Sequence, residues 1–191
     1  MSSTLTAAAW EAMYAPYDQP TYQEVLDLLM SADVVLDIGA GDLQLSRQMA
    51  PIVRKVYVVE MNASVLDQAS AARDPLPGNL IPICADARAF HFPSDTTVGV
   101  MLMRHCIHFR LYFEKLRDAG ARRFITNARW RMGVEEVDLR ADRIRFNEFD
   151  MGWYACLCGR TGFKAGPAEQ WSTGMDKVIY EVADCPHCER G

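Results

Sequence analysis

The run Val-Val-Leu-Asp-Ile at residues 34–38, followed directly by Gly39 and Gly41, constrains the fold of this chain more than any other stretch. A short apolar run with one acid is typical of a buried parallel strand. Glycine then permits a tight turn and lets a ligand approach the backbone without a Cβ in the way. Asp42 is a good N-cap for a helix over about residues 43–50. This order of strand, glycine turn and helix N-terminus predicts a cradle for a cofactor.

The residues around the turn distinguish between two cofactor classes. A dinucleotide fingerprint would need a third glycine at position 44, where this chain has Gln44. Asp37 lies two residues before the first glycine, and an acid there can serve a ligand that carries an ammonium group. The next predicted strand, residues 56–60, ends in Glu60, 19 positions after Gly41. A carboxylate at that place can accept both hydroxyls of a ribose.

These features resemble the class I S-adenosylmethionine (SAM)-dependent methyltransferases. The residues that carry the resemblance are 35–41, Glu60, and Asp86 within the segment 83–87. The resemblance covers about residues 14–183 in order and spacing. It implies that the glycine turn faces the methionine part of SAM, that the acid after strand two holds the ribose, and that the acid after strand three meets the adenine.

The resemblance also implies a set of cofactor-binding residues at the glycine turn, at the ends of the strands and in the N-terminal segment. They are Asp37, Gly39, Ala40, Gly41, Asp42, Glu60, Met61, Asp86, Ala87, Arg104, Tyr14 and Tyr17. Tyr22 is a further candidate, and the alternative is that these tyrosines are core or surface aromatics. The family often has another glycine where this chain has Leu43, which leaves the geometry at the methionine end open. A nucleotide-free domain that uses these residues only for turns and caps is the competing interpretation.

The pattern of the rest of the chain predicts alternating strands and helices. We expect further strands at 80–84, 97–103 and 123–127, and helices at 4–14, 21–30, 62–73 and 107–119, with Thr21 and Glu24 forming a capping box. The alternation predicts an α/β fold with a doubly wound, mostly parallel seven-stranded sheet and helices on both faces. Strands at about 165–171 and 177–182 would close the sheet as a C-terminal antiparallel hairpin.

We expect one domain over residues 1–191, in which 1–31 form an N-terminal helical cap and 151–191 the C-terminal hairpin. Charges of both signs alternate over 129–150, which predicts a solvated helix or lid. The chain has 191 residues, is half apolar and carries a net charge of −5, which argues against non-specific nucleic-acid binding. No apolar run approaches the ~20 residues of a membrane span. The N-terminus does not resemble a signal peptide, so we expect a cytoplasmic protein without membrane contact.

Four of the six cysteines lie in the last 36 residues, as Cys156-Leu-Cys158 and Cys185-Pro-His-Cys188. Two such pairs on turns can supply four thiolates in a tetrahedron, and Cys-Pro-x-Cys is typical of zinc knuckles. The first pair has one intervening residue instead of two, and a purely structural role in the hairpin is the other interpretation. If zinc binds, we expect it to be structural, because four thiolates leave no open position for water.

The segment 103–109 follows the fourth predicted strand and should face the methyl acceptor. His105 is the best candidate for a base or an acceptor-orienting group, Arg104 could bind an anionic substrate, and His108 is the second choice. The histidines could instead cap the next helix or satisfy core carbonyls, and Cys106 is more simply a small buried thiol than a nucleophile. The Asn/Asp-Pro-Pro-aromatic signature of amino-directed nucleic-acid methyltransferases is absent.

We therefore predict an enzyme that moves a methyl group from SAM to an unidentified acceptor by in-line displacement. The acceptor could be a macromolecule, a substrate presented by a partner, or a small molecule enclosed by the N-terminal helix and the segment 129–150. The alternative is a catalytically silent, SAM-binding and zinc-stabilised subunit that holds or activates a partner protein. A plain zinc-stabilised interaction module would leave Asp37, Glu60 and Asp86 unexplained.

Overall fold

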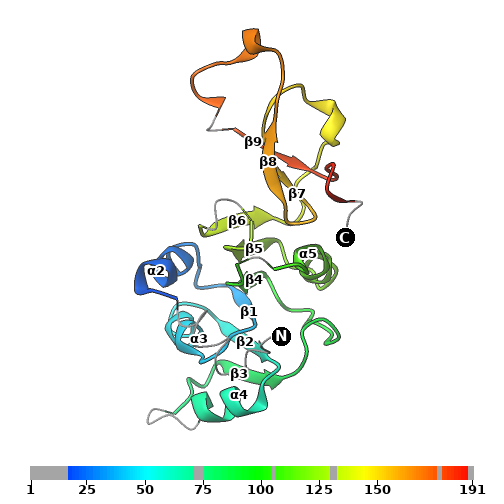
Figure 1. Cartoon of the computed structure of the whole chain (residues 1–191). Helices are drawn as coiled ribbons and strands as arrows, with labels where there is room; N and C mark the ends of the chain where they lie inside the picture. Colours follow the sequence, from blue (N-terminus) through cyan, green and yellow to red (C-terminus); the bar gives the residue numbers. More distant parts are fainter. Residues whose placement is uncertain (1–16, 71–74, 105, 130–132, 176–177, 189–191) are drawn as a thin grey trace, which may run out of the picture.

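The computed structural model describes residues 17–70, 75–104, 106–129, 133–175 and 178–188 (Figure 1). Three predictions fall outside these ranges: the helix over 4–14 with Tyr14, and the histidine at position 105. In the described part of the chain, every helix is too short or too polar to cross a bilayer.

The central sheet follows the predicted strand positions closely. Its strands are β1 (Val34–Ile38), β2 (Lys55–Glu60), β3 (Leu80–Cys84), β4 (Val98–Met101), β5 (Arg123–Thr126) and β6 (Glu135–Asp138). Their order is β3-β2-β1-β4-β5-β6, parallel except for β6, which runs antiparallel to β5. The chain order reverses between β1 and β4, and open α/β sheets generally bind their ligands at the carboxyl ends of the strands at such a point.

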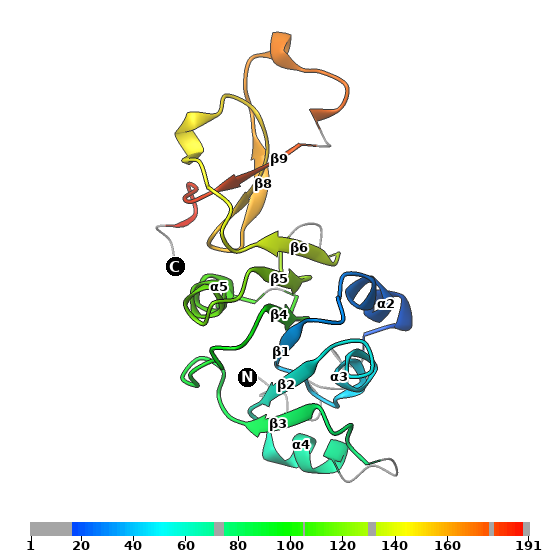
Figure 2. The ribbon, with the colours of Figure 1, turned by 180° about the vertical axis from the view of Figure 1, so that it is seen from behind.

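Helices cover both faces of this sheet, as predicted (Figures 1 and 2). They are α2 (Gln19–Asp27), α3 (Gln44–Met49), α4 (Ala63–Ser70) and α5 (Phe109–Asp118). The first three lie on one face, where Tyr22, Met49 and Leu66 join one buried cluster. α5 covers the other face with Phe109 and Phe113, which are almost completely buried.

The start of α2 corrects a predicted cap. The helix begins at Gln19, and its N-cap is Asp18, whose carboxylate accepts a hydrogen bond from the backbone N–H of Thr21 at 3.0 Å. Pro20 stands in the first turn, where a missing backbone N–H has no consequence. The expected capping box starting at Thr21 is therefore wrong, because an aspartate three residues earlier already satisfies that N–H.

The C-terminal part of the chain differs from the predicted hairpin. It forms a separate three-stranded sheet in the order β8-β7-β9, from β7 (Gly152–Cys156), β8 (Thr161–Lys164) and β9 (Ile179–Val182). β7 pairs antiparallel with β8 but parallel with β9. The central sheet thus has six strands in the described residues, not seven. Residues 165–171 contain the short 3-10 helix η3 (Ala168–Gln170) in place of a strand.

The segment 129–150 also differs from the prediction. Its described residues contain β6 and a 3-10 helix, η2 (Phe146–Glu148), where a solvated helix or lid was expected. β6 pairs with β5 because Val137 can pack into the core on the α5 face while its charged neighbours stay outside. β6 thereby occupies the edge of the sheet at which we expected the C-terminal hairpin.

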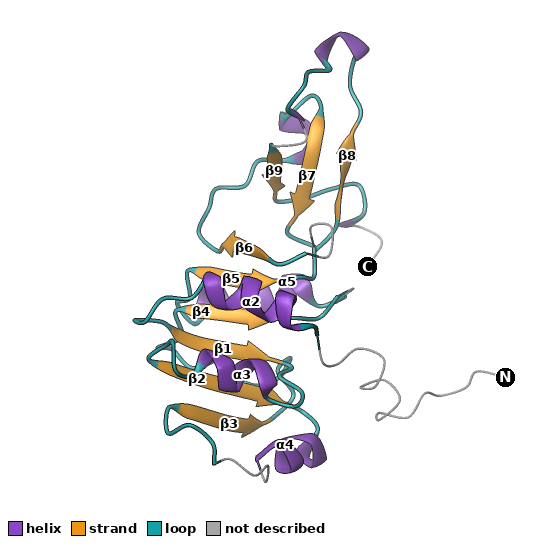
Figure 3. Cartoon of the chain, turned by 90° about the vertical axis from the view of Figure 1, so that its left-hand side faces the viewer, coloured by secondary structure: helices purple, strands orange, loops and turns teal. Residues whose placement is uncertain are grey.

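The small sheet packs beside β6 and α5 (Figure 3). Arg129, just past β5, has a side chain that is 1% exposed and pairs with Glu135 of β6 at 3.0 Å and with Glu181 of β9 at 2.7 Å. Its guanidinium also lies 5.3 Å from the ring centroid of Phe109. One buried cation therefore joins both sheets and α5.

Candidate functional site

The glycine turn after β1 has the backbone conformation that its composition predicts. Gly39 has φ 71° and Gly41 has φ 55°, values that side chains disfavour. The backbone N–H of Gly39 donates to the carbonyl oxygen of Val59 at 2.8 Å, which ties the turn to β2. A Cβ on Gly39 would approach the Met103 side chain to 3.3 Å. No described heavy atom lies within 4 Å of the place where a Cβ on Gly41 would stand, so the backbone there is open.

Leu43 takes a left-handed backbone conformation at the position where the resembled family often has glycine. It is the only non-glycine residue with positive φ among those described, at 64°, and it is fully buried. α3 begins at Gln44 with Leu43 as the N-cap, so Asp42 lies one residue too early for its predicted capping role. Its carboxylate instead accepts a hydrogen bond from the Gln44 N–H at 3.1 Å. Leu43 therefore keeps the left-handed backbone conformation that a glycine would take here. Its side chain packs in the core, whereas a glycine would leave the backbone uncovered.

Glu60 lies at the end of β2 and directs its carboxylate to the glycine turn. Its Oε2 accepts a hydrogen bond from the Gly41 N–H at 3.1 Å, and its Oε1 accepts one from the Asn62 N–H at 2.8 Å. Each carboxylate oxygen has a second lone pair, so the group can still accept two hydroxyls side by side. The residue is 9% exposed, which limits competition from water. Met61, the next residue, is 66% exposed at the same edge.

Asp37 lies beneath the turn and is buried. The hydroxyl of Ser46 in α3 donates to its Oδ2 at 2.5 Å. Burial raises the pKa of Asp37 to about 7, the negative charge of Glu60 adds to this, and the hydrogen bond from Ser46 opposes it. Asp37 thus links β1 to α3 and holds the two ends of the turn together. Its 4% exposure leaves little surface for direct contact with a ligand.

Asp86 follows β3 and is half-buried at the same edge of the sheet, while Ala87 beside it is buried. Arg88 binds the carboxylate of Asp86 in a bidentate pair, with Nε 2.9 Å from Oδ1 and Nη2 2.7 Å from Oδ2. These hydrogen bonds hold the pKa of Asp86 at about 2. An adenine amino group would therefore compete with Arg88 for this carboxylate.

Tyr17 and Arg104 meet across the mouth of the turn. The backbone N–H of Arg104 donates to the Tyr17 hydroxyl at 3.4 Å, and its guanidinium lies 5.3 Å from the Tyr17 ring centroid. Tyr22, in contrast, is 5% exposed in the core cluster, where burial raises its pKa to about 12. Of the two described tyrosines, Tyr17 therefore lies beside Arg104, whereas Tyr22 packs α2 into the core; Tyr14 lies outside the described residues.

His108 stands at the N-cap position of α5, although its side chain makes no capping hydrogen bond within the described structure. Its ring meets Tyr112 edge-on, with the centroids 6.4 Å apart. Cys106 is half-buried, and burial raises the pKa of its thiol, which disfavours a thiolate nucleophile. Ile107, between them, is 87% exposed. The loop before α5 thus presents a histidine and an apolar side chain at the carboxyl edge.

Asn127, directly after β5, was not predicted as a site residue. It is fully buried, and neither its Oδ1 nor its Nδ2 has a hydrogen-bond partner among the described residues. Buried amides are rarely left in this state, so such a group at the carboxyl edge is a candidate for contact with a ligand or water. Its position, at the last residue of a predicted strand, is the signal by which the sequence could have pointed to it.

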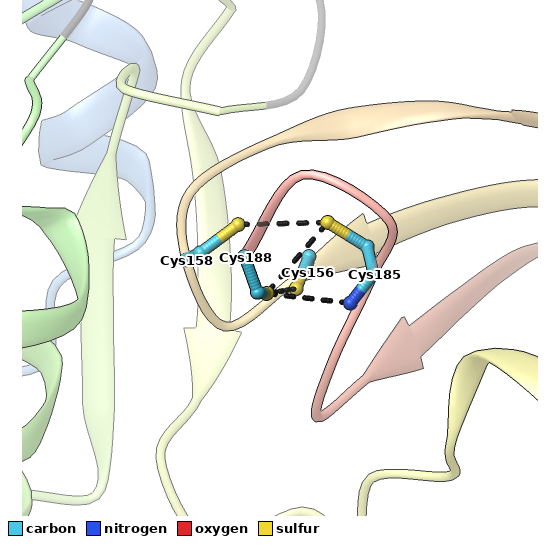
Figure 4. A group of neighbouring side chains, drawn as sticks. All are labelled: Cys156, Cys158, Cys185 and Cys188. Atoms are coloured by element: carbon cyan, nitrogen blue, oxygen red, sulfur yellow. Dashed lines mark hydrogen bonds between the residues drawn. The ribbon is translucent and has the colours of Figure 1, made fainter. Parts of the chain in front are cut away.

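The four C-terminal cysteines come together on two turns (Figure 4). Their sulfur atoms all lie within 4.8 Å of one another, with 3.4 Å between Cys156 and Cys188 and 3.7 Å between Cys158 and Cys185. All four are free thiols. The parallel pairing of β7 with β9 produces this cluster, because the carboxyl ends of parallel strands lie at the same edge. In the predicted hairpin, two antiparallel strands would have brought the cysteine pairs to the same end.

A cavity of about 420 Å³ lies at the opposite, amino edge of the central sheet. Arg123 lines it and pairs with Asp33 at 2.6 Å and with Glu136 at 2.8 Å. Because these charges neutralise one another and lie away from the glycine turn, this cavity is not assigned to the cofactor.

No protein-family model matches the chain, and no curated protein sequence matches it either. Solved structures match its fold. Precorrin 8W decarboxylase from Methanobacterium thermoautotrophicum gives a TM-score of 0.51 at 21% identity, over 59% of this chain and 63% of that one. The 23S rRNA methyltransferase ErmE gives 0.51 at 18%, over 58% and 46%. YjhP from E. coli gives 0.50 at 15%, over 59% and 50%.

This chain therefore spans about half to under two thirds of the length of these structures. The likeness concerns the arrangement of the backbone, since the identities are low. It agrees with the order β3-β2-β1-β4-β5, with helices on both faces, and with a glycine turn at the switch between β1 and β4. On these grounds, the chain has a class I methyltransferase-like fold.

Proposed function

We propose that this protein transfers a methyl group from SAM to an acceptor. The observation that carries the proposal is the contact between Glu60 and the glycine turn, in which the N–H groups of Gly41 and Asn62 orient one carboxylate. A carboxylate held in this way can accept the two hydroxyls of a ribose beside an open backbone, which supports the proposal. The methyltransferase-like fold supports the same assignment, but fold alone does not define a function.

The residues at the carboxyl edge suit the parts of SAM in order. Gly39 and Gly41 would lie along the methionine part, Glu60 would accept the ribose hydroxyls, and Asp86 with Ala87 would meet the adenine. Asp37 would act from below, by keeping the turn in place through Ser46. Arg104 and Tyr17 would close the site from the other side.

When bound, SAM supplies an electrophilic methyl group on a sulfonium. Held by Gly39, Gly41 and Glu60, it would offer this methyl carbon for in-line displacement by an acceptor lone pair, with the electron pair of the carbon–sulfur bond leaving on sulfur. The chain contributes position, which can account for roughly 7–11 kcal/mol of the barrier in favourable cases. A base is needed only for an acceptor that must lose a proton, and His108 or the histidine at 105 would fill that role.

The acceptor side would comprise the loop before α5 and the end of β5. Arg104 offers a positive charge for an anionic acceptor, and Asn127 offers an amide that can both donate and accept a hydrogen bond. The four clustered cysteines lie outside this chemistry, because a metal ion with four thiolate ligands has no open position for a substrate. The solved structures of similar fold do not define the acceptor of this chain.

Calorimetry with SAM and with S-adenosylhomocysteine tests the proposal directly. We expect both to bind the full chain, and we expect Glu60→Ala and Gly39→Arg to weaken binding severely. Asp118→Ala is the matched control, because that carboxylate is 73% exposed on the far end of α5. Failure of both ligands to bind would end the assignment.

Transfer of radiolabelled methyl groups to fractionated cell extract then separates an enzyme from a silent SAM-binding subunit. We expect labelling of one fraction by the unaltered protein and none by Glu60→Ala. Tight binding of SAM without transfer to any fraction would instead favour the second role, a subunit that holds or activates a partner.

A further inference from the structure

We propose that Cys156, Cys158, Cys185 and Cys188 hold one structural zinc ion, which fastens the turn at 156–159 against the first turn of α5. This inference goes beyond methyl transfer and does not depend on it. It rests on the geometry of the sulfur atoms, on the size of the small sheet and on the contacts of one glycine.

The sulfur positions fit a tetrahedral ion. A tetrahedron with metal–sulfur bonds of about 2.3 Å has sulfur–sulfur edges of about 3.8 Å. The distances here are 3.4 Å from Cys156 to Cys188, 3.7 Å from Cys158 to Cys185 and 3.8 Å from Cys185 to Cys188. A disulfide would need about 2.05 Å, so these thiols are gathered but not bonded. Four sulfur ligands in a tetrahedron favour zinc, with iron as the competitor.

The two turns that carry the cysteines are held in place by their own backbone. In the first, the Gly159 N–H donates to the Cys156 carbonyl oxygen at 2.9 Å, and Gly159 has φ 90°. In the second, the Cys188 N–H donates to the Cys185 carbonyl at 3.0 Å, and the Cys185 N–H points at the Cys188 sulfur at 3.3 Å. An N–H directed at sulfur stabilises a thiolate, the form that binds zinc.

The small sheet has too few buried residues to be stable by packing alone. Its buried cluster consists of Phe149, Tyr154, Cys156, Val182 and Cys185. Units of about 40 residues usually need a metal, disulfides or a partner surface in addition to their core. Two of the five buried members are cysteines, so a metal ion bound to them would add to this small buried cluster.

Gly159 connects the proposed metal site to α5 by close packing. A Cβ placed on Gly159 would come within 2.8 Å of the Cβ of Phe109, the first residue of α5. Leu157, in the same turn, packs against the buried cluster on the α5 face. The turn therefore supports the start of α5, directly after the loop that carries His108. Loss of the metal should loosen this helix start and leave the glycine turn after β1 intact.

Elemental analysis of the full chain, purified without chelator, tests the metal site. We expect about one zinc per chain and a tetrathiolate charge-transfer spectrum after exchange with cobalt. Cys188→Ser should lose the zinc, whereas Cys84→Ser, which alters an exposed thiol outside the cluster, should keep it. Metal-free protein, or iron in place of zinc, would overturn the site.

Two measurements cover the case in which Cys188→Ser does not fold. Removal of zinc from the unaltered protein by a chelator should lower its melting temperature, and added zinc should restore it. Thiol titration of the denatured, unreduced and metal-free chain should count all six cysteines. A count of two would mean two disulfides and would contradict the proposal.

Hydrogen exchange tests the support of α5. We expect the amides of residues 110–113 to exchange faster after zinc removal, while those of α3 keep their protection. Unchanged exchange in α5 after complete loss of zinc would show that the metal does not fasten the helix.

Discussion

Leu43 combines a strained backbone with a buried side chain, and the two properties can be separated by substitution. Leu43→Ala loses the packing and keeps the strain, so we expect it to lower the free energy of unfolding by about 2–5 kcal/mol. Leu43→Gly also loses the packing but relieves the left-handed conformation at φ 64°. We expect it to be about 1 kcal/mol less destabilising than Leu43→Ala. Urea titration of both variants measures the difference, and the reverse order would show that the backbone is not strained.

Asp37 should make stability depend on pH in a defined direction. Burial raises its pKa to about 7 in the folded chain from 3.8 in the unfolded one, so its stabilising effect is complete below pH 3.8 and is lost as the pH rises to 7. Asp37→Asn removes this dependence. The stability of the variant relative to the unaltered protein should therefore rise between pH 4.5 and 7.5, on the order of 1–4 kcal/mol.

Denaturant titrations at the two pH values measure the effect of Asp37→Asn. Asp118→Asn, an exposed carboxylate, serves as the control and should show no comparable change. If Asp37→Asn changed the free energy of unfolding by the same amount at both pH values, the carboxyl of Asp37 would be ionised throughout this range.

Asn127 has a buried side chain without a described hydrogen-bond partner. Such an amide should lower the stability of the fold and serve the function of the protein. Asn127→Leu keeps the volume and removes the unpaired polar atoms, so we expect the free energy of unfolding to rise by about 1–3 kcal/mol. We expect methyl transfer to fall, with SAM affinity unchanged, because the proposed acceptor side includes this amide. A loss of stability in Asn127→Leu would show that the amide is paired in the native protein.

At the scale of elements, Arg129 is the connection between the two sheets. Replacing it with methionine removes the cation that lies 3.0 Å from Glu135 and 2.7 Å from Glu181, while Arg143 stays 3.6 Å from Glu181, and we expect a loss of about 3–5 kcal/mol in the free energy of unfolding. Arg110→Met is the control, since its pair with Glu114 is exposed within α5, and we expect a change within about 0.5 kcal/mol. Thermal and urea unfolding measure both variants.

The two arginine variants also test whether the sheets unfold together. If Arg129→Met unfolds in a single transition with unchanged stability, the ion pairs do not join the sheets. A separate early transition of the small sheet would support the connection, because the small sheet would then have lost its anchor.

At the scale of the whole molecule, the proposed SAM site and the proposed zinc site lie on different sheets and should stabilise the protein separately. A ligand that binds only the folded state at 100 times its dissociation constant adds about 2.7 kcal/mol. We expect SAM to raise the stability of zinc-depleted protein by a similar amount, and to have no effect on Glu60→Ala. Scanning calorimetry at several SAM concentrations checks this. A SAM effect that vanishes with the zinc would show that the two sites depend on each other.

Local sequence determined the parallel strands of the central sheet, because their signals act over a few residues. The apolar run before Gly39 became β1, and the predicted strands at 56–60, 80–84 and 123–127 became β2, β3 and β5 with ends within one residue. The chemistry of the glycine turn and the carboxylate of Glu60 could be predicted in the same way. Each depends on spacing along the chain and on the fixed edge at which parallel strands end.

Tertiary structure alone decided how the C-terminal strands pair and what surrounds each charge. Whether β9 joins the central sheet or lies parallel to β7 depends on contacts far apart in sequence, such as Arg129 with Glu181. The bidentate pair of Arg88 with Asp86 and the burial of Asp37 have no local signature either. The sequence alone thus determined a glycine turn beside the end of β2 and two cysteine pairs, while long-range packing decided that the pairs meet beside α5, because burial and charge pairing are properties of the folded chain.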